Sequence, residues 1–232
     1  MNKLKNFFVH LISAIYPKKC ICCSELIDEE KQICDSCNSL IERNNLNGIC
    51  IDCGFEKYEC VCKYHVYRFN GLICVFKNKN LAQQAYYSYK FLKKQHYCSF
   101  FAEEMANAVL KCYCDIKFDF ICSVPSNNRY GYNHCGYIAR QMAKILKIPY
   151  SENFLHCVKK TKKQHRSTFK ERLINVEGKY KCNTRLDNKR ILLVDDIKTT
   201  GATLDECSKM LLYSGADSVY CITLLGSSTS KN

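Results

Sequence analysis

An unbroken aliphatic run that leads into two aspartates constrains the fold of this chain more than any other segment. Ile191 to Val194 is aliphatic throughout, which is typical of a strand buried on both faces of a parallel sheet. Asp195 and Asp196 follow at the point where that strand is expected to end. Leu204 to Leu212 has the pattern of a helix. A strand, a polar turn and a helix in this order predict one unit of an α/β domain.

The polar turn of this unit has the composition of a phosphate site. Its residues are Lys198, Thr199, Thr200, Gly201, Ala202 and Thr203. Backbone N–H groups at a helix N-terminus attract anions, threonine hydroxyls add donors, and Gly201 permits close approach of a ligand. The turn lacks the spacing of a Walker-type loop. Asp195 and Asp196 can accept hydrogen bonds from the vicinal hydroxyls of a sugar, so the segment predicts a ribose 5-phosphate site. The alternative is a strand end followed by a capped helix.

A cysteine-rich segment precedes this unit, and it holds nine of the nineteen cysteines. Three Cys-x-x-Cys pairs and one Cys-x-Cys pair supply the candidate metal ligands, which are Cys20, Cys23, Cys34, Cys37, Cys50, Cys53, Cys60 and Cys62. Four thiolates at tetrahedral angles suit a structural Zn²⁺ ion, and metal binding would supply folding free energy to a segment with little apolar sequence. The eight cysteines could hold two zinc ions, in sequential or interleaved pairing, or only one, with Cys22 left over.

Redox-active pairs and disulfides are the alternative uses of these cysteines. Neither explains the repetition of the pairs in a short, loop-rich segment. An odd cysteine total and the lack of a convincing export signal argue against a secreted disulfide framework.

The first residues and the net charge bear on where this chain acts. Phe7, Leu11 and Ile15 fall on one face of a helix, so we expect a short amphipathic helix that packs on the adjoining cysteine-rich segment, with membrane attachment as the alternative. The apolar run is too short to span a bilayer, so we expect a cytoplasmic protein with no transmembrane segment. A formal net charge of +13 favours a polyanionic partner, unless the lysines only serve solubility.

Strand and helix patterns alternate from Phe118 onward. The expected fold class is therefore α/β, with a mainly parallel sheet and helices on both faces. We expect two parts, namely an N-terminal helix with a small zinc-ribbon-like module at 1–63 and the α/β domain at 64–232. At the start of that domain, strand candidates on either side of Asn70-Gly71 predict a hairpin.

Two further segments are candidates for ligand contacts. The basic segment 159–175 predicts an exposed loop of the kind that often carries function, or else a solvated linker. A second cluster could stack and attract single-stranded nucleic acid, or could be core aromatics beside a solvated lysine edge. It comprises Tyr86, Tyr87, Tyr89, Phe91, Lys90, Lys93 and Lys94.

The segment LVDDIKTTGATL, from Leu193 to Leu204, resembles the phosphoribosyl diphosphate (PRPP) binding motif of type I phosphoribosyltransferases. A cysteine-rich module followed by such a domain is similar to the ComF family of competence proteins, and the resemblance covers nearly the whole chain. Val124-Pro125 and residues 129–133 resemble the family's diphosphate segment. The residues that resemble its flexible hood loop are Thr161, Gln164, Arg172 and Asn175.

The resemblance implies a type I phosphoribosyltransferase-like domain that binds PRPP, with Mg²⁺ on the diphosphate. Asp195 and Asp196 would hold the ribose hydroxyls at the catalytic centre, and the loop 199–203 would hold the 5-phosphate. Arg129 and Gln164 would contact the diphosphate leaving group.

Two residues depart from the family's pattern. Tyr130 stands where the family usually has arginine, and His134 where it has glutamine. Arg129 is the neighbour that could substitute for the missing arginine, and catalysis depends on whether it does.

For function, the resemblance implies a competence factor that acts in DNA uptake and natural transformation. It would bind single-stranded DNA, with a competence helicase or a recombination mediator as its partner. The alternatives are an active phosphoribosyltransferase on an unknown acceptor and a non-catalytic sensor of PRPP or a nucleotide.

Overall fold

The computed structural model describes residues 17–60, 66–91, 95–126, 133–159 and 176–227. The amphipathic helix expected around Phe7 to Ile15 lies outside these residues. Among the described residues, no helix combines the length and the apolar composition needed to cross a bilayer.

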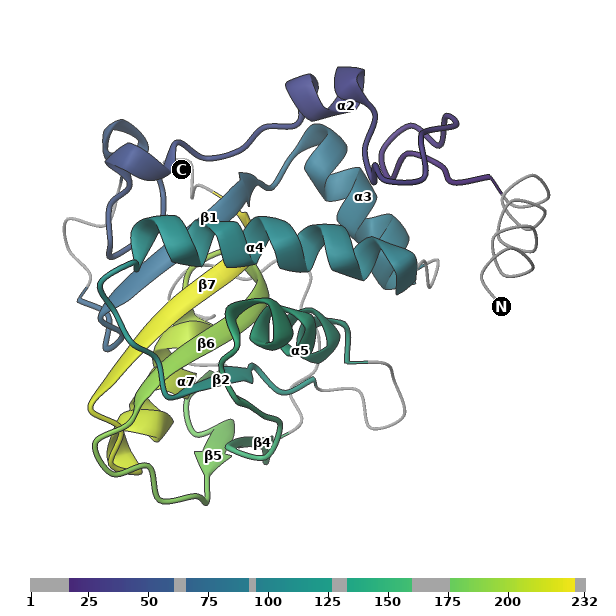
Figure 1. The fold of residues 1–232 in the computed structure, drawn as a ribbon. Coiled ribbons are helices and arrows are strands. Elements are labelled where there is room, and N and C mark those ends of the chain that lie inside the picture. Colours follow the sequence, from purple (N-terminus) through teal and green to yellow (C-terminus); the bar gives the residue numbers. More distant parts are fainter. Residues whose placement is uncertain (1–16, 61–65, 92–94, 127–132, 160–175, 228–232) are drawn as a thin grey trace, which may run out of the picture.

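A five-stranded sheet forms the centre of the fold (Figure 1). In spatial order its strands are β1 (Gly71–Lys77), β7 (Ser218–Gly226), β6 (Arg190–Lys198), β2 (Phe120–Ser123) and β3 (Tyr150–Ser151). Each pair of neighbours is parallel. β6 and β7 lie inside the sheet, covered on both faces, which explains their aliphatic sequences. The predicted mainly parallel sheet is confirmed.

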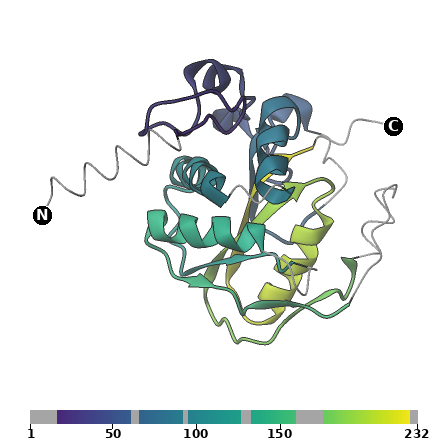
Figure 2. The same ribbon diagram turned by 90° about the vertical axis from the view of Figure 1, so that its right-hand side faces the viewer.

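Helices cover both faces of this sheet (Figures 1 and 2). One face carries α3 (Asn80–Phe91), α4 (Cys98–Cys112) and α5 (His134–Leu146), whose buried side chains share a core cluster with β1 and β6. α7 (Ala202–Tyr213) packs in a second cluster on the opposite face. The prediction of helices on both faces is therefore confirmed.

A separate antiparallel pair of strands lies beside α7 (Figure 1). It is formed by β4 (Leu155–Cys157) and β5 (Tyr180–Cys182), and Leu155 and Tyr180 bury their side chains in the same cluster as α7. The expected loop at 159–175 connects these strands, and apart from Lys159 it lies outside the described residues.

Two local predictions are wrong. The expected hairpin at Asn70-Gly71 does not form, because Asn70 bonds Val219 through both its backbone N–H and its side-chain oxygen, and β1 runs parallel to β7. The strand expected to end after Val194 continues to Lys198, because β7 extends alongside it and pairs Lys198 with Gly226.

The cysteine-rich segment lies against α4 and β1 (Figure 1). It contains the helix α2 (Asp35–Leu40) and the short 3-10 turns η1 (Leu46–Gly48) and η2 (Lys57–Glu59), and a third such turn, η3 (Gln95–Tyr97), precedes α4. Ile21 and Ile41 are buried in the α4 cluster, and Arg43 forms a 2.8 Å ion pair with Glu104 of α4. The segment thus folds onto the α/β part, and the boundary at residue 63 stays a prediction because residues 61–65 are not described.

Candidate functional site

An open, polar pocket lies where β6 ends and α7 begins. One continuous stretch of chain forms the pocket. β6 supplies the Asp195 carboxylate and ends at Lys198, and α7 begins at Ala202 after a short loop. The residues that line the pocket are Asp195, Ile197, Lys198, Thr199, Thr200, Gly201, Ala202, Thr203 and Leu204. The structure therefore brings Asp195 and all six predicted loop residues to one place, at the carboxyl edge of a parallel sheet, where ligands of open α/β folds bind.

Gly201 sets the shape of this loop. Its φ of +82° lies in the left-handed region, and a Cβ atom there would come within 2.9 Å of the Tyr67 ring. The Tyr67 hydroxyl donates a 2.9 Å hydrogen bond to the Thr200 carbonyl oxygen, and the Thr200 hydroxyl accepts from the Ala202 N–H at 3.3 Å. The loop is thus fixed from outside by Tyr67 and from inside by Thr200, and any residue other than glycine at 201 would strain it.

The acidic pair is asymmetric, because Asp195 faces the pocket while Asp196 faces α3. Lys90 of α3 places its Nζ 2.5 Å from an Asp196 carboxylate oxygen, and the Tyr86 hydroxyl donates to the same oxygen. Asp195 accepts a 2.8 Å hydrogen bond from the Asp196 N–H.

The pKa values of the two carboxyls shift in opposite directions. Burial, followed by the charge of Asp196, raises the pKa of the Asp195 carboxyl well above its ordinary value. Burial also opposes ionisation of Asp196, but the Lys90 charge and the hydrogen bonds from Lys90 and Tyr86 outweigh it and lower the pKa of that carboxyl. Burial and the neighbouring charge thus favour the protonated form of the Asp195 carboxyl, whereas Lys90 and Tyr86 favour the ionised form of Asp196.

Sequence reasoning did not identify Tyr86 and Lys90 as partners of the acidic pair. Both belong to the predicted aromatic and basic cluster, which the structure divides. Tyr86 and Tyr89 are fully buried, whereas Tyr87 and Phe91 are exposed with ring centroids 5.7 Å apart. Lys93 and Lys94 lie outside the described residues. The spacing of the tyrosines on α3 was the available signal, because Tyr86, Tyr89 and Lys90 share one side of the helix.

The predicted diphosphate contacts fall at the edge of the part of the chain that the structure describes. Arg129, Tyr130 and Gln164 lie outside the described residues. His134 begins α5, where its ring meets the Tyr89 ring edge-on at 5.3 Å and its carbonyl oxygen accepts from the Tyr89 hydroxyl at 3.0 Å. His134 is thus held by the same helix that supplies Lys90 to the acidic pair.

Lys198 has an unexpected environment for a residue predicted to bind phosphate. It is 5% exposed, and its Nζ lies 4.4 Å from the centre of the Phe55 ring, which belongs to the cysteine-rich segment. An ammonium group over an aromatic face is held by cation–π attraction. The loop therefore begins at a residue that the cysteine-rich segment covers.

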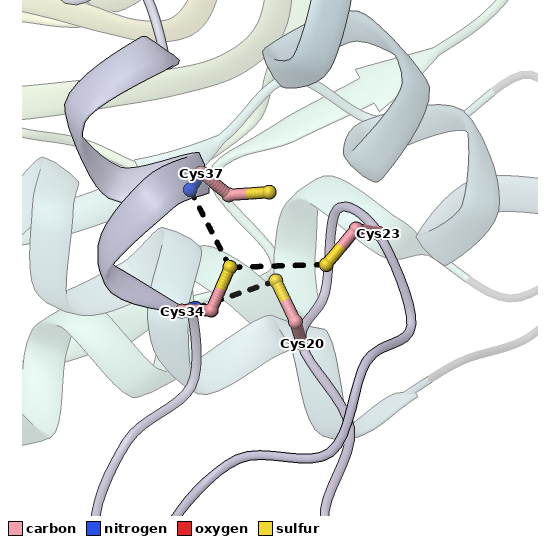
Figure 3. Close-up of side chains that lie close together, drawn as sticks. All are labelled: Cys20, Cys23, Cys34 and Cys37. Carbon is pink, nitrogen blue, oxygen red and sulfur yellow. Dashed lines mark hydrogen bonds between the residues drawn. The ribbon is translucent and has the colours of Figure 1, made fainter.

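Four predicted metal ligands come together in the first cysteine cluster, which consists of Cys20, Cys23, Cys34 and Cys37 (Figure 3). Their sulfur atoms all lie within 4.8 Å of one another, and the Cys23 and Cys34 sulfurs are 3.8 Å apart. Four sulfurs about 2.3 Å from a tetrahedral zinc ion would be separated by roughly 3.8 Å. The donor set therefore fits a structural zinc ion.

Backbone N–H groups support thiolates in this first cluster. The Cys22 and Cys34 N–H groups both donate to the Cys20 sulfur at 3.4 Å. Burial alone would raise the pKa of the Cys20 thiol, but the backbone hydrogen bonds from Cys23, Cys34 and Cys22 bring it down to about 6. Burial and the neighbouring cysteines raise the pKa of the Cys22 thiol to about 12, so Cys22 remains a thiol beside the cluster.

A second cysteine cluster joins Cys50, Cys53 and Cys60, whose sulfurs also lie within 4.8 Å of one another. Cys62, the expected fourth ligand, lies outside the described residues. Of the pairing schemes left open by the sequence, the structure groups the cysteines sequentially. Three converging thiols supply most of a tetrahedral zinc site and so fit the same ion.

The molecule therefore combines two parts. One is a cysteine-rich segment that could hold metal, and the other is a parallel α/β domain with an acidic pair beside its loop. No family model matches the chain. The chain is 33% identical to Competence protein F of Haemophilus influenzae over 94 residues. This matched region covers 39% of this chain and 41% of that protein. Over 105 residues the chain is 28% identical to the DNA utilization protein YhgH of Salmonella typhimurium, covering 44% and 46% of the two chains. These matches confirm the resemblance to ComF-type proteins, and each spans less than half the length of the curated relative.

The solved structures similar to this chain include phosphoribosyltransferases. An adenine phosphoribosyltransferase matches with a TM-score of 0.42 and 12% identity, over 58% of this chain and 72% of that one. A purine phosphoribosyltransferase from Pyrococcus horikoshii matches with a TM-score of 0.36 and 20% identity, over 55% and 74%. Neither likeness says what this chain binds.

Proposed function

We propose that this chain is a ComF-type competence factor whose α/β domain binds PRPP in the pocket between β6 and α7. The observation that carries this proposal is the arrangement of Asp195 and the loop 198–203 around one pocket at the carboxyl edge of the sheet. Asp195 and Asp196 lie on the strand that leads into a helix N-terminus, so a sugar diol and a 5-phosphate can be held by one stretch of chain.

In this proposal the residues divide the ligand between them. The loop N–H groups and threonine hydroxyls hold the 5-phosphate, and Asp195 holds the ribose hydroxyls while Lys90 and Tyr86 hold Asp196. Arg129 and Gln164 contact the diphosphate, on which Mg²⁺ neutralises charge when it is bound. Positioning and charge stabilisation, more than a chemical group of the protein, would then account for any rate at the anomeric carbon.

Calorimetry with PRPP and Mg²⁺ tests the site. Asp195→Ala should abolish or greatly weaken binding, because Asp195 is the carboxylate that lines the pocket. Asp119→Asn is the matched control, since Asp119 bonds the N–H of Arg190 at the opposite end of β6. Equal affinity in wild type and Asp195→Ala, or no binding by wild type, would refute a sugar-phosphate site here.

We further propose that the chain acts in the cytoplasm, in DNA uptake and natural transformation. In this role its basic surface binds single-stranded DNA, and its partner is a competence helicase or a recombination mediator. The names of the relatives and the net charge of +13 support it. Binding of single-stranded DNA that weakens steeply with salt is the expected result. Failure to bind at low salt would overturn this part of the proposal.

Turnover of PRPP separates the two remaining alternatives. Diphosphate release in the presence of an acceptor would make the chain a phosphoribosyltransferase, whereas binding without release would make it a sensor. Tyr130, in place of the arginine that the family usually has, favours the sensor. A Tyr130→Arg variant that gains diphosphate release over wild type would support that interpretation, because it restores a cation beside the leaving group.

A further inference from the structure

An aromatic side chain, Phe55, connects the second cysteine cluster to the loop at 198–203. Phe55 follows Cys53 by two residues and is 3% exposed. The turn that carries it is closed by two backbone hydrogen bonds, from the Cys50 N–H to the Phe55 carbonyl at 2.7 Å and from the Gly54 N–H to the Cys50 carbonyl at 2.8 Å. The position of Phe55 is therefore set by the same turn that brings Cys50 and Cys53 together.

This turn is fixed to the sheet at close range. The Leu72 N–H of β1 donates to the Ile51 carbonyl at 2.7 Å. Gly54 approaches Cys74 so closely that a Cβ atom would lie 2.8 Å from the Cys74 sulfur. A Cβ atom on Gly226, at the end of β7, would lie 2.9 Å from the tip of the Phe55 ring. There is no free space at this contact, so a shift of the turn must move the strand ends or be opposed by them.

Phe55 meets the loop at its first residue. Lys198 pairs with Gly226 across β6 and β7, and its carbonyl oxygen accepts from the Ser227 N–H at 2.8 Å. Its ammonium group lies over the Phe55 ring at 4.4 Å. Because the side chain is almost fully buried, this ring is the aromatic face that compensates the ammonium for lost water.

We propose that Phe55 is a positioning residue through which the Cys50, Cys53 and Cys60 cluster controls the loop at 198–203. With metal bound to the cluster, the turn is rigid, the ring holds Lys198, and the loop is ordered for the 5-phosphate. Without metal, the turn loosens and PRPP affinity falls. The effect on affinity rests on the proposed PRPP site, whereas the effect on the loop does not.

Hydrogen exchange of the full-length protein loaded with Zn²⁺ tests the link without any ligand. Exchange of the peptide covering 198–204 should rise about tenfold in Phe55→Leu and in Cys50→Ser. Phe100→Leu is the matched control for the first change, since Phe100 is also buried but belongs to α4 and packs on Phe76. Cys23→Ser is the control for the second, since it removes a ligand from the first cysteine cluster.

Metal analysis and calorimetry complete the test. Phe55→Leu should keep the wild-type zinc content and bind PRPP about tenfold more weakly, which places Phe55 between the metal and the loop. Unchanged loop exchange in Phe55→Leu, or an equal rise in Cys23→Ser and Cys50→Ser, would overturn the link. If the exchange pattern holds but wild type binds no PRPP, the link stands and the proposed PRPP site fails.

Discussion

Replacing Lys90 with methionine removes the ammonium group that contacts Asp196 and keeps a side chain of similar length. The Nζ lies 2.5 Å from the carboxylate oxygen and 5.4 Å from the centre of the Tyr86 ring, and the two side chains of the ion pair are 32% and 21% exposed. Loss of this cation leaves two adjacent carboxyls, Asp195 and Asp196, with only the Tyr86 hydroxyl as the described side-chain donor to Asp196.

The size of the effect follows from this partial burial. A hydrogen bond to a charged group contributes about 1.5–3 kcal/mol, and partial exposure of the pair reduces the expected loss to about 2 kcal/mol. For a chain of this length, 1 kcal/mol shifts the melting temperature by roughly 2–4 °C, so Lys90→Met should melt about 4–8 °C below wild type at pH 7. Thermal unfolding followed by circular dichroism measures the shift.

The pH dependence gives the sign of the effect. The pKa of Asp196 in the folded protein lies below its ordinary value, so the ion pair stabilises the fold above the unfolded pKa of about 4. That contribution is lost as the pH falls through the folded-state pKa. The difference in melting temperature between wild type and Lys90→Met should therefore be full at pH 7 and shrink below about pH 4.

Lys79→Met is the matched control. Lys79 forms a 2.7 Å ion pair with Glu42, but the two side chains are 54% and 33% exposed. Exposed pairs contribute little, so this change should lower stability far less than Lys90→Met does. Equal shifts for Lys79→Met and Lys90→Met would refute the claim that partial burial makes the Lys90 contact stronger.

Three other substitutions test the remaining features of the site and the first cysteine cluster. Asp195→Asn should raise the melting temperature at pH 7 by a few degrees. Burial raises the pKa of the Asp195 carboxyl, so the folded state is penalised wherever the unfolded carboxyl is ionised, and the variant should lose its advantage below about pH 4. Gly201→Ala should destabilise by about 1–2 kcal/mol in urea unfolding, whereas Gly48→Ala, with open space around it and no positive φ, should change little. Cys37→Ser should lower the zinc content measured by metal analysis, whereas Cys22→Ser should keep it, since Cys22 lies outside the group of four.

The parts of the fold that could be predicted from sequence are those specified locally. The aliphatic residues of β6 and the loop before α7 predict their own conformation, because burial on both faces requires an unbroken apolar run. The helix predicted at Leu204 to Leu212 lies within α7, and its side chains Leu204 and Leu211 are buried. The cysteine pairs also predicted their clusters, because two thiols three residues apart can bind one ion with little contribution from the rest of the chain.

Strand boundaries depend on the neighbouring strand and were less predictable. Asp195 and Asp196 read as the end of a strand because charged residues are rare inside sheets. The sequence of β6 does not show that β7 continues beside it and pairs with Lys198. The Asn70-Gly71 pair likewise has hairpin composition, but its preference is overridden by the hydrogen bonds between Asn70 and Val219.

The electrostatics of the site come from contacts between segments far apart in the sequence. Lys90 and Asp196 are separated by 106 residues, and nothing local to either residue specifies that they meet. Their contact requires α3 to pack across the face of the sheet from which Asp196 projects, just as the Phe55 contact requires the cysteine-rich segment to reach the end of β6. The motif therefore indicates what the loop can bind, whereas α3 and the cysteine-rich segment determine how its acids are ionised and where its lysine lies. A loop with the same motif but without these two partners would have a solvated acidic pair and a solvated Lys198, and so a different affinity for the same ligand.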